Sequence, residues 1–220
     1  MHFDQTVAQL LSSRICHDLV GPIGAVNSGL ELLEEDFDDD GAAKGLIIKS
    51  ADEAKCRLSF YRAAFGKGAS NLVDTSWKTA LNEARNVAEG FLKGSKVSLD
   101  WGEVPSDLLE PVLPASIKVI LNLVLMAYDS LPRGGSVGLS FAVLGEGFGV
   151  GLAFSGEGAN LRDDLRSAIE LELIDVKDIL SARNVHAFLA QQMAQELGAF
   201  IEYSDGARGE GQLAVLFPKN

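Results

Sequence analysis

The sequence of 220 residues predicts an α+β fold in two parts, a helical hairpin over residues 1–68 and an α/β sandwich over residues 69–220. As far as Phe65, apolar residues recur only at helical spacings. After Gly66 and Gly68, helical segments alternate with strand-like ones, so a second domain begins there. With 47% hydrophobic residues, both parts can bury a core, which excludes a disordered chain.

Two long helices are predicted in the first part, the first from Phe3 to about Glu35 and the second ending before Gly66. In each, apolar residues recur at spacings of three and four, the pattern of a heptad seam. The two seams consist of Leu19, Ile23, Val26, Leu30 and Leu33, and of Ile47, Ala51, Ala54, Leu58, Tyr61 and Phe65. The segment from Asp36 to Gly41 forms the tip, which makes the hairpin antiparallel.

Further apolar residues lie outside these seams, and a single hairpin cannot bury all of them. They are Leu10, Leu11 and Ile15 on the first helix and Ile48 and Phe60 on the second. A second copy of the chain would cover this surface and complete a four-helix bundle. The sequence therefore predicts a homodimer.

The second part reads as alternating helices and strands, the order of an α/β sandwich. In chain order we expect a helix capped by Thr75 or Ser76 and running to Leu92, a strand over 96–101, a helix opened by Pro114 and running over 115–131, strands over 136–144 and 148–154, an irregular stretch over 155–180, a helix over 183–197 capped by Gly198, and a final hairpin over 199–203 and 212–217.

Charge and cysteine content exclude several function classes. The 19 Lys and Arg residues against 31 Asp and Glu give a net charge of −12, which argues against nucleic-acid binding. Neither a leader segment nor a membrane span is expected, so we predict a cytoplasmic protein that is not associated with a membrane. Cys16 and Cys56 form no CxxC pair, which predicts two reduced thiols and no metal site.

His17 is the candidate catalytic residue. At 100° per residue it lies about 200° around the helix from Leu19, so a buried seam turns the imidazole toward solvent. A neutral, exposed imidazole offers a lone pair for nucleophilic attack. Asp18 can orient the ring by accepting a hydrogen bond from one nitrogen. Arg14, one turn earlier, is expected either to stabilise a phosphoryl group or to contact a partner, and Pro22 should bend the helix.

The segment from Arg14 to Ala25, RICHDLVGPIGA, resembles the phosphoacceptor box of histidine kinase dimerisation domains. Together with Gly29–Leu32, it resembles more narrowly the ChpT-type histidine phosphotransferases of α-proteobacteria. The second part resembles the ATP-binding (Bergerat) domain of histidine kinases. The resemblance implies a phosphotransferase with a phosphohistidine intermediate, acting in two-component signal transduction and cell-cycle regulation.

At the positions that match the kinase nucleotide site, the expected ligand residues are missing. Met126 stands where a magnesium-holding Asn is expected, and Phe154 where a carboxylate should accept the adenine amino group. The segment 182–186, ARNVH, replaces a glycine-rich lid. We therefore expect neither ATP binding nor any cofactor on this chain.

Without ATP chemistry, the resemblance implies a phosphorelay. His17 would accept the phosphoryl group from a receiver-domain Asp of a CckA-like hybrid histidine kinase and pass it to CtrA-like and CpdR-like response regulators. Mg²⁺ is expected on those receiver domains. The expected docking surface consists of Val20, Gly21, Pro22, Gly24, Ala25 and Ser28.

Three alternatives stay open at this point. The chain could be the core of an ATP-dependent sensor histidine kinase, or an adaptor that binds response regulators without transferring phosphate. The former nucleotide pocket could also bind another small ligand.

Overall fold

The computed structural model describes residues 5–34, 40–66, 76–106, 114–145, 147–171 and 179–218. Most of the expected hairpin tip, the expected domain boundary after residue 68 and His2 lie outside these ranges.

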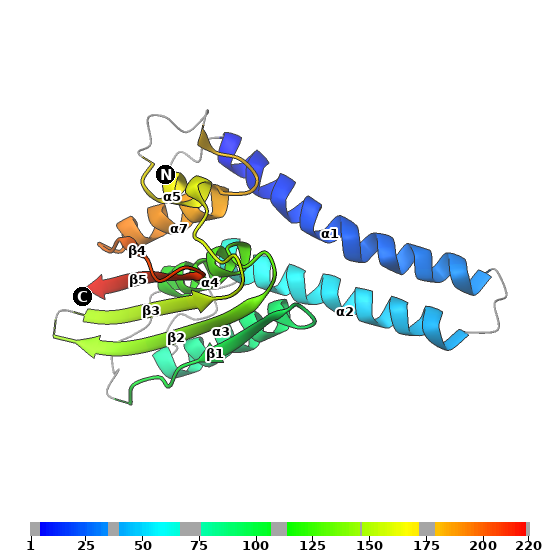
Figure 1. Ribbon diagram of the computed structural model, residues 1–220, viewed down its shortest axis with the longest axis horizontal. Coiled ribbons are helices and arrows are strands. Elements are labelled where there is room, and N and C mark those ends of the chain that lie inside the picture. Colours follow the sequence, from blue (N-terminus) through cyan, green and yellow to red (C-terminus); the bar gives the residue numbers. More distant parts are fainter. Residues whose placement is uncertain are drawn as a thin grey trace.

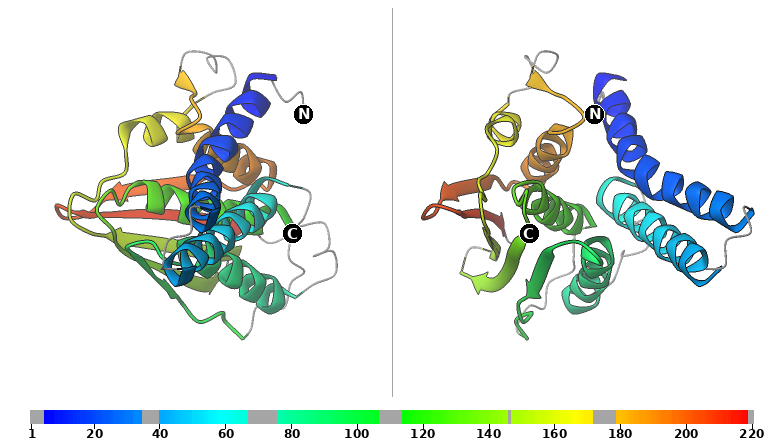
Figure 2. Two further views of the ribbon diagram at one scale, coloured as in Figure 1. Left: turned by 90° about the vertical axis from the view of Figure 1, so that its right-hand side faces the viewer. Right: turned by 45° about the vertical axis from the view of Figure 1, so that its right-hand side comes forward.

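Helix α1 (Gln5–Glu34) and helix α2 (Asp40–Phe65) lie side by side and project from the rest of the molecule (Figure 1). The buried residues of α1 are spaced seven or eight apart and form one stripe: Val7, Arg14, Pro22 and Gly29. A Cβ atom at Gly29 would lie 2.6 Å from Cγ1 of Ile47, so the glycine permits a close approach of the helices. Helix α1 changes direction along its length (Figure 2), as expected for a helix with an internal proline.

The predicted seams are only partly correct. Ile23, Leu30 and Leu58 were expected between the two helices, but they are 56%, 47% and 50% exposed. Conversely, the surplus residues Leu10, Leu11 and Ile15 pack against the main core, and Phe60 is fully buried. The reason is that the base of the hairpin rests on the second part of the chain. Ile48 is exposed, as expected.

The sheet has five strands in the order β1-β2-β3-β5-β4. These are β1 (Val97–Trp101), β2 (Gly135–Leu144), β3 (Gly147–Ser155), β4 (Ile201–Asp205) and β5 (Glu210–Pro218). Strands β1 and β2 are parallel, and the other pairs are antiparallel. The predicted strands are confirmed, with ends shifted by at most two residues.

Helices cover one face of this sheet, and the other face is open (Figure 2). Along β5, Leu213, Val215 and Phe217 are buried, whereas Ala214 and Leu216 between them are exposed. The helices are α3 (Trp77–Leu92), α4 (Pro114–Asp129), α5 (Asp163–Ile169) and α7 (Val185–Glu196).

Local signals set the ends of these helices. Oγ of Ser76 accepts a hydrogen bond from the backbone N–H of Thr79 at 3.3 Å, so Ser76 caps α3. Gly198 follows α7 with a φ of 71°, the left-handed conformation that glycine tolerates best. The stretch 155–180, expected to be irregular, contains α5, a helix too short to leave a periodic apolar pattern.

The hairpin and the sheet domain share one hydrophobic core. Phe60 of α2 stacks on Phe91 of α3 with ring centroids 4.2 Å apart. The side-chain amide of Asn122 on α4 donates to the backbone oxygen of Ala64 at 3.4 Å. These contacts fix the base of the hairpin, where His17 lies, against the second domain.

Replacing Phe60 tests this joint. Because Phe60 is fully buried, Phe60→Ala should lower the free energy of unfolding by about 3–5 kcal/mol, measured by urea denaturation. Phe200→Ala is the matched control, since Phe200 is 60% exposed and its loss should cost less than about 1 kcal/mol. Equal effects of the two substitutions would contradict the packing of α2 on α3.

Candidate functional site

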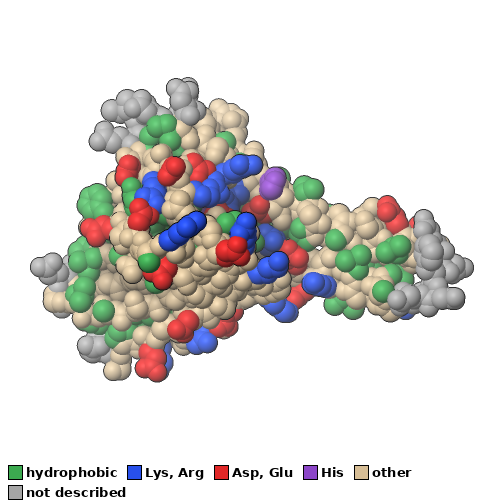
Figure 3. Space-filling view, in the orientation of Figure 1, with side chains coloured by type: hydrophobic (Ala, Val, Ile, Leu, Met, Phe, Trp, Pro, Cys, Tyr) green, Lys and Arg blue, Asp and Glu red, His purple; other side chains and the backbone are tan. Residues whose placement is uncertain are grey.

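His17 lies on the outer face of α1, and its side chain is 88% exposed, as the helix geometry predicts. Figure 3 shows a histidine at the surface where the hairpin meets the second domain, near a group of Lys and Arg side chains. The described residues contain no group of His, Cys, Asp or Glu side chains suited to hold a metal ion. With this exposure, the imidazole is accessible from solvent.

Asp18 contacts the imidazole, and two further residues hold its carboxylate. Its Oδ1 lies 3.2 Å from Nδ1 of His17. Its Oδ2 accepts a hydrogen bond from the hydroxyl of Tyr61 on α2 and lies 3.7 Å from Nε of Arg14. The side chain of Asp18 is 21% exposed, so the carboxylate is a fixed part of the site and not a freely solvated charge.

Arg14 points inward, which corrects the expectation that it shares the surface with His17. It is 7% exposed. Its Nη2 donates to Oδ1 of Asp129 at 3.0 Å, and its Nη1 donates to the backbone oxygen of Arg183 at 3.1 Å. Arg14 belongs to the buried stripe of α1, so its guanidinium joins the hairpin to α4 and to the loop before α7. Neither phosphate stabilisation nor partner contact follows from this placement.

His186 completes this buried cluster. Nη1 of Arg14 lies 3.3 Å from Nδ1 of His186, and because a guanidinium only donates hydrogen bonds, Nδ1 is the acceptor. The ring proton of the neutral imidazole is then on Nε2, 3.5 Å from Oδ2 of Asp129. Burial lowers the pKa of His186 well below its usual value, and burial raises the pKa of Asp129 against the opposing effect of Arg14. His186 is therefore a fully buried residue that contacts Arg14.

The expected docking residues are mostly accessible. Val20 is 69% exposed, and Gly21, Gly24 and Ser28 are also exposed, whereas Ala25 is partly buried. Pro22 is a correction. It is buried, because it lies on the same stripe of α1 as Arg14 and Gly29, and so cannot form part of a docking surface.

The positions that match the kinase nucleotide site are occupied by packing residues. Met126 is fully buried, and Phe154 is 2% exposed, both within the hydrophobic core. Asn122 is also buried, and its amide nitrogen donates to the backbone oxygens of Lys118 and Ala64. These side chains therefore serve the core.

Asn184 fixes the segment that replaces the lid. Its amide nitrogen donates to the backbone oxygens of Asp164 and Ile179, both at 3.0 Å. Its Oδ1 accepts from the backbone N–H and the hydroxyl of Ser181. No sequence pattern indicates this role, since an Asn in a short loop has many uses. Tyr61 was also missed as a site residue, because its position fits the predicted seam.

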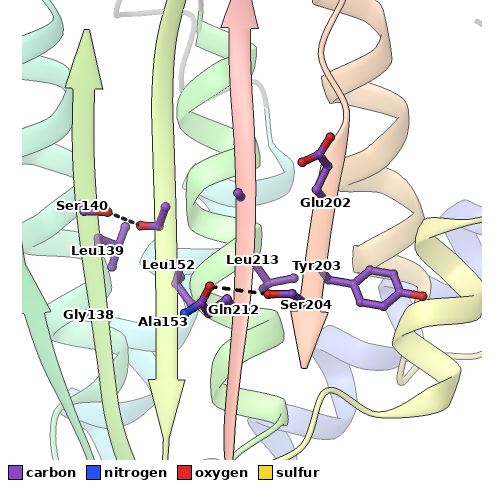
Figure 4. Close-up of a pocket in the computed structure, with 12 residues that line it drawn as sticks. Gly138, Leu139, Ser140, Leu152, Ala153, Glu202, Tyr203, Ser204, Gln212 and Leu213 are labelled. Atoms are coloured by element: carbon purple, nitrogen blue, oxygen red, sulfur yellow. Dashed lines mark hydrogen bonds between the residues drawn. The ribbon is translucent and has the colours of Figure 1, made fainter. Parts of the chain in front are cut away.

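A shallow hollow lies on the open face of the sheet, over strands β2, β3, β5 and β4 (Figure 4). Its accessible lining is mainly small or neutral, with Glu202 as the charged group. It is separate from Met126 and Phe154, whose side chains lie in the core. No helix in the described part of the chain is both long and apolar enough to cross a membrane.

The buried cluster makes stability depend on pH. Because the pKa of His186 is lowered in the folded state, its contribution to stability is present above about pH 6.5 and is lost as the pH falls, by up to about 1.4 kcal/mol per unit. His186→Gln should remove this slope in urea denaturation between pH 7 and pH 5. The raised pKa of Asp129 changes stability with pH in the opposite direction, but Asp129 is present in both the wild-type protein and the His186→Gln variant, so its effect cancels in the comparison. An unchanged slope would contradict the burial of a neutral His186.

Comparison with known proteins gives matches along the chain. A family model described as the histidine phosphotransferase C-terminal domain matches residues 81–209, which excludes α1 and α2. The protein phosphotransferase ChpT of Brucella abortus (strain 2308) is 40% identical over 129 residues, 58% of this chain and 57% of that protein. The matched part thus spans little more than half the length of this curated relative.

Solved structures extend the likeness to the hairpin. The 1.7 Å structure of a bacterial phosphotransferase is 28% identical, covers 98% of both chains and has a TM-score of 0.79. The histidine kinase ThkA in complex with the response regulator protein TrrA covers 95% of this chain and 61% of its own, with 15% identity and a TM-score of 0.54. This second likeness concerns the fold alone and confirms the expected kinase-like architecture. Because the family model spans more than half of the residues, the chain belongs to the histidine phosphotransferase family.

Proposed function

We propose that this protein is the histidine phosphotransferase of a multi-step phosphorelay and carries the phosphoryl group on His17. The observation that supports this most is the exposed imidazole with Asp18 at its Nδ1. If Asp18 accepts a hydrogen bond from the Nδ1–H group of His17, the free lone pair of the imidazole is on Nε2, and Nε2 is the nucleophile.

The transfer moves one phosphoryl group between two carboxylates through the imidazole. Nε2 of His17 attacks the phosphorus of an aspartyl phosphate, the new P–N bond forms as the P–O bond to Asp breaks, and the aspartate leaves as a carboxylate. The proton stays on Nδ1, where Asp18 stabilises the positive charge that develops on the ring. The second transfer is the reverse, with the Asp of another receiver as nucleophile.

The surface around His17 suits a receiver domain. Val20, Gly21 and Gly24 are exposed and leave an accessible stretch on α1 beyond the histidine. Arg183, whose backbone oxygen is bound by Arg14, is exposed on the neighbouring loop. Positive charge there favours approach of an anionic aspartate and its phosphoryl group, although the whole chain carries −12.

The proposed partners are receiver domains that bring their own Mg²⁺. The kinase ThkA, similar in fold, is in a complex with a response regulator. We place a CckA-like hybrid kinase upstream and CtrA-like and CpdR-like regulators downstream, in the cytoplasm and in cell-cycle regulation. In this proposal Arg14 contacts Asp18 from the buried side of α1 and does not touch the phosphoryl group.

The same proposal excludes ATP as the phosphoryl donor. Met126 and Phe154 offer neither a magnesium ligand nor a carboxylate for adenine, and both are buried in the core. The two rivals, an ATP-dependent kinase and an adaptor without transfer, each predict a different labelling result.

His17→Ala should abolish phosphoryl transfer without unfolding the protein, because the side chain is exposed and makes no core contact. A labelled receiver domain is the donor, ATP is removed after the donor is charged, and label on the chain and on a second receiver is followed. Cys16→Ala, a change at the neighbouring exposed residue, is the control and should transfer normally.

Each rival would be recognised in that experiment. Label that reaches the second receiver through His17→Ala would overturn the role of His17. Label taken directly from ATP would identify a kinase, and binding of receivers without labelling of the wild-type chain would identify an adaptor.

We also propose that the active form is a homodimer. The exposed flank of the hairpin is a shallow apolar groove whose lining includes Ile23, Val26, Ala51, Ala54 and Leu58. Ile48 and Leu30, which are 71% and 47% exposed, add to the apolar surface of the hairpin. A second hairpin would bury these side chains and complete a four-helix bundle.

Light scattering at micromolar concentration should give twice the chain mass of 23.4 kDa. Leu58→Glu should shift this to the monomer, because it places a charge in the groove. Leu216→Glu is the matched control, since Leu216 is an exposed leucine on β5. A monomeric wild-type protein would refute the dimer.

A further inference from the structure

We propose that the hydroxyl of Tyr61 is a positioning group for His17, acting through Asp18. This inference deepens the proposed function. Only the predicted effect of Tyr61 on phosphoryl transfer rests on that function; the predicted effect on the geometry of His17 does not. Tyr61 lies on α2, whereas His17 and Asp18 lie on α1, so one helix of the hairpin would set the reactive geometry of the other.

The two oxygens of Asp18 have different partners. Oδ2 accepts a hydrogen bond from the hydroxyl of Tyr61 and lies 3.7 Å from Nε of Arg14. Oδ1 is left for Nδ1 of His17 at 3.2 Å. A carboxylate anchored at one oxygen has a fixed plane, so the position of the second oxygen is fixed as well. The hydrogen bond to the imidazole is then directional, although the imidazole itself is in solvent.

Tyr61 is rigid enough for this task. It is 2% exposed, and its ring lies nearly parallel to that of Phe65, with centroids 5.7 Å apart and an angle of 8°. Phe60 and Phe91 meet it edge-on. Burial and the bond to Asp18 raise the pKa of the Tyr61 hydroxyl, so it remains a proton donor at neutral pH.

The consequence is a fixed tautomer of His17. A neutral imidazole can carry its proton on either nitrogen, and a hydrogen bond at one of them decides which. Asp18 accepts from Nδ1 and so leaves the lone pair on Nε2. Without the hydroxyl of Tyr61, the carboxylate can rotate, and the preference for the Nδ1–H form weakens.

The first test measures the tautomer and needs no partner protein. In ¹⁵N NMR spectra at a pH where His17 is neutral, Tyr61→Phe should shift its two nitrogens toward the Nε2–H form. The His17→Ala spectrum assigns the signals. Tyr203→Phe is the matched control, because the Tyr203 hydroxyl also donates to a carboxylate, that of Glu170, and should leave His17 unchanged. An unchanged tautomer in Tyr61→Phe would overturn the proposal.

The second test measures transfer. Tyr61→Phe should slow the single-turnover rate from a charged receiver roughly tenfold. Its affinity for the receiver should not change, because Tyr61 is buried. In an Asp18→Asn background, where the carboxylate is absent, Tyr61→Phe should have no further effect on the rate. Additive losses would show that Tyr61 acts independently of Asp18 and would refute the proposal.

The two tests separate this proposal from the proposed function. If the wild-type chain accepts no phosphoryl group from any receiver, the relay fails, and the NMR result still decides the role of Tyr61. If the relay works but Tyr61→Phe transfers at the wild-type rate with an unchanged tautomer, only the role of Tyr61 is lost.

Discussion

The buried guanidinium of Arg14 is the constraint on which the arrangement of the molecule depends. It pairs with Asp129 on α4 and binds the backbone of Arg183 before α7, so one side chain joins the hairpin to two elements of the second domain. A buried ion pair adds little net stability, because desolvation offsets the attraction, but removing one partner leaves an unpaired charge in the interior. Its effect here is to select one relative placement of hairpin and sheet.

That placement puts two opposite environments within one helical turn. Arg14 is sealed in the interior, His17 is in solvent, and Asp18 lies between them with one oxygen toward each side. The side chains of Arg14 and His17 are only about 60° apart around the helix, so the edge of the narrow buried stripe of α1 lies between them. The buried Arg14 thus fixes the position of this part of α1, while the imidazole of His17 remains accessible.

The second domain has a kinase-like fold, and the positions that match the kinase nucleotide site are filled by packing residues. Met126 and Phe154 fill the core, Asn122 ties α4 to the end of α2, and Asn184 fixes the loop before α7. A fold does not by itself determine the chemistry of a domain, because the core and the site depend on different side chains. In this chain the domain supports the hairpin and borders the surface around His17.

The sequence by itself determined the helices other than α5, the strands and their order along the chain, the exposure of His17 and the pairing with Asp18, because these follow from local periodicity and from adjacent residues. It could not decide which apolar residues of the hairpin are covered: Leu58, placed in the seam, is exposed, whereas Phe60, placed outside it, is buried because the second domain packs on it. Tertiary structure alone decided that Arg14 turns inward to Asp129, that Pro22 is buried and that Tyr61 holds Asp18. Each of these depends on residues brought together from more than 40 positions away in the chain or from a neighbouring helix, and spacing along the sequence carries no information about them.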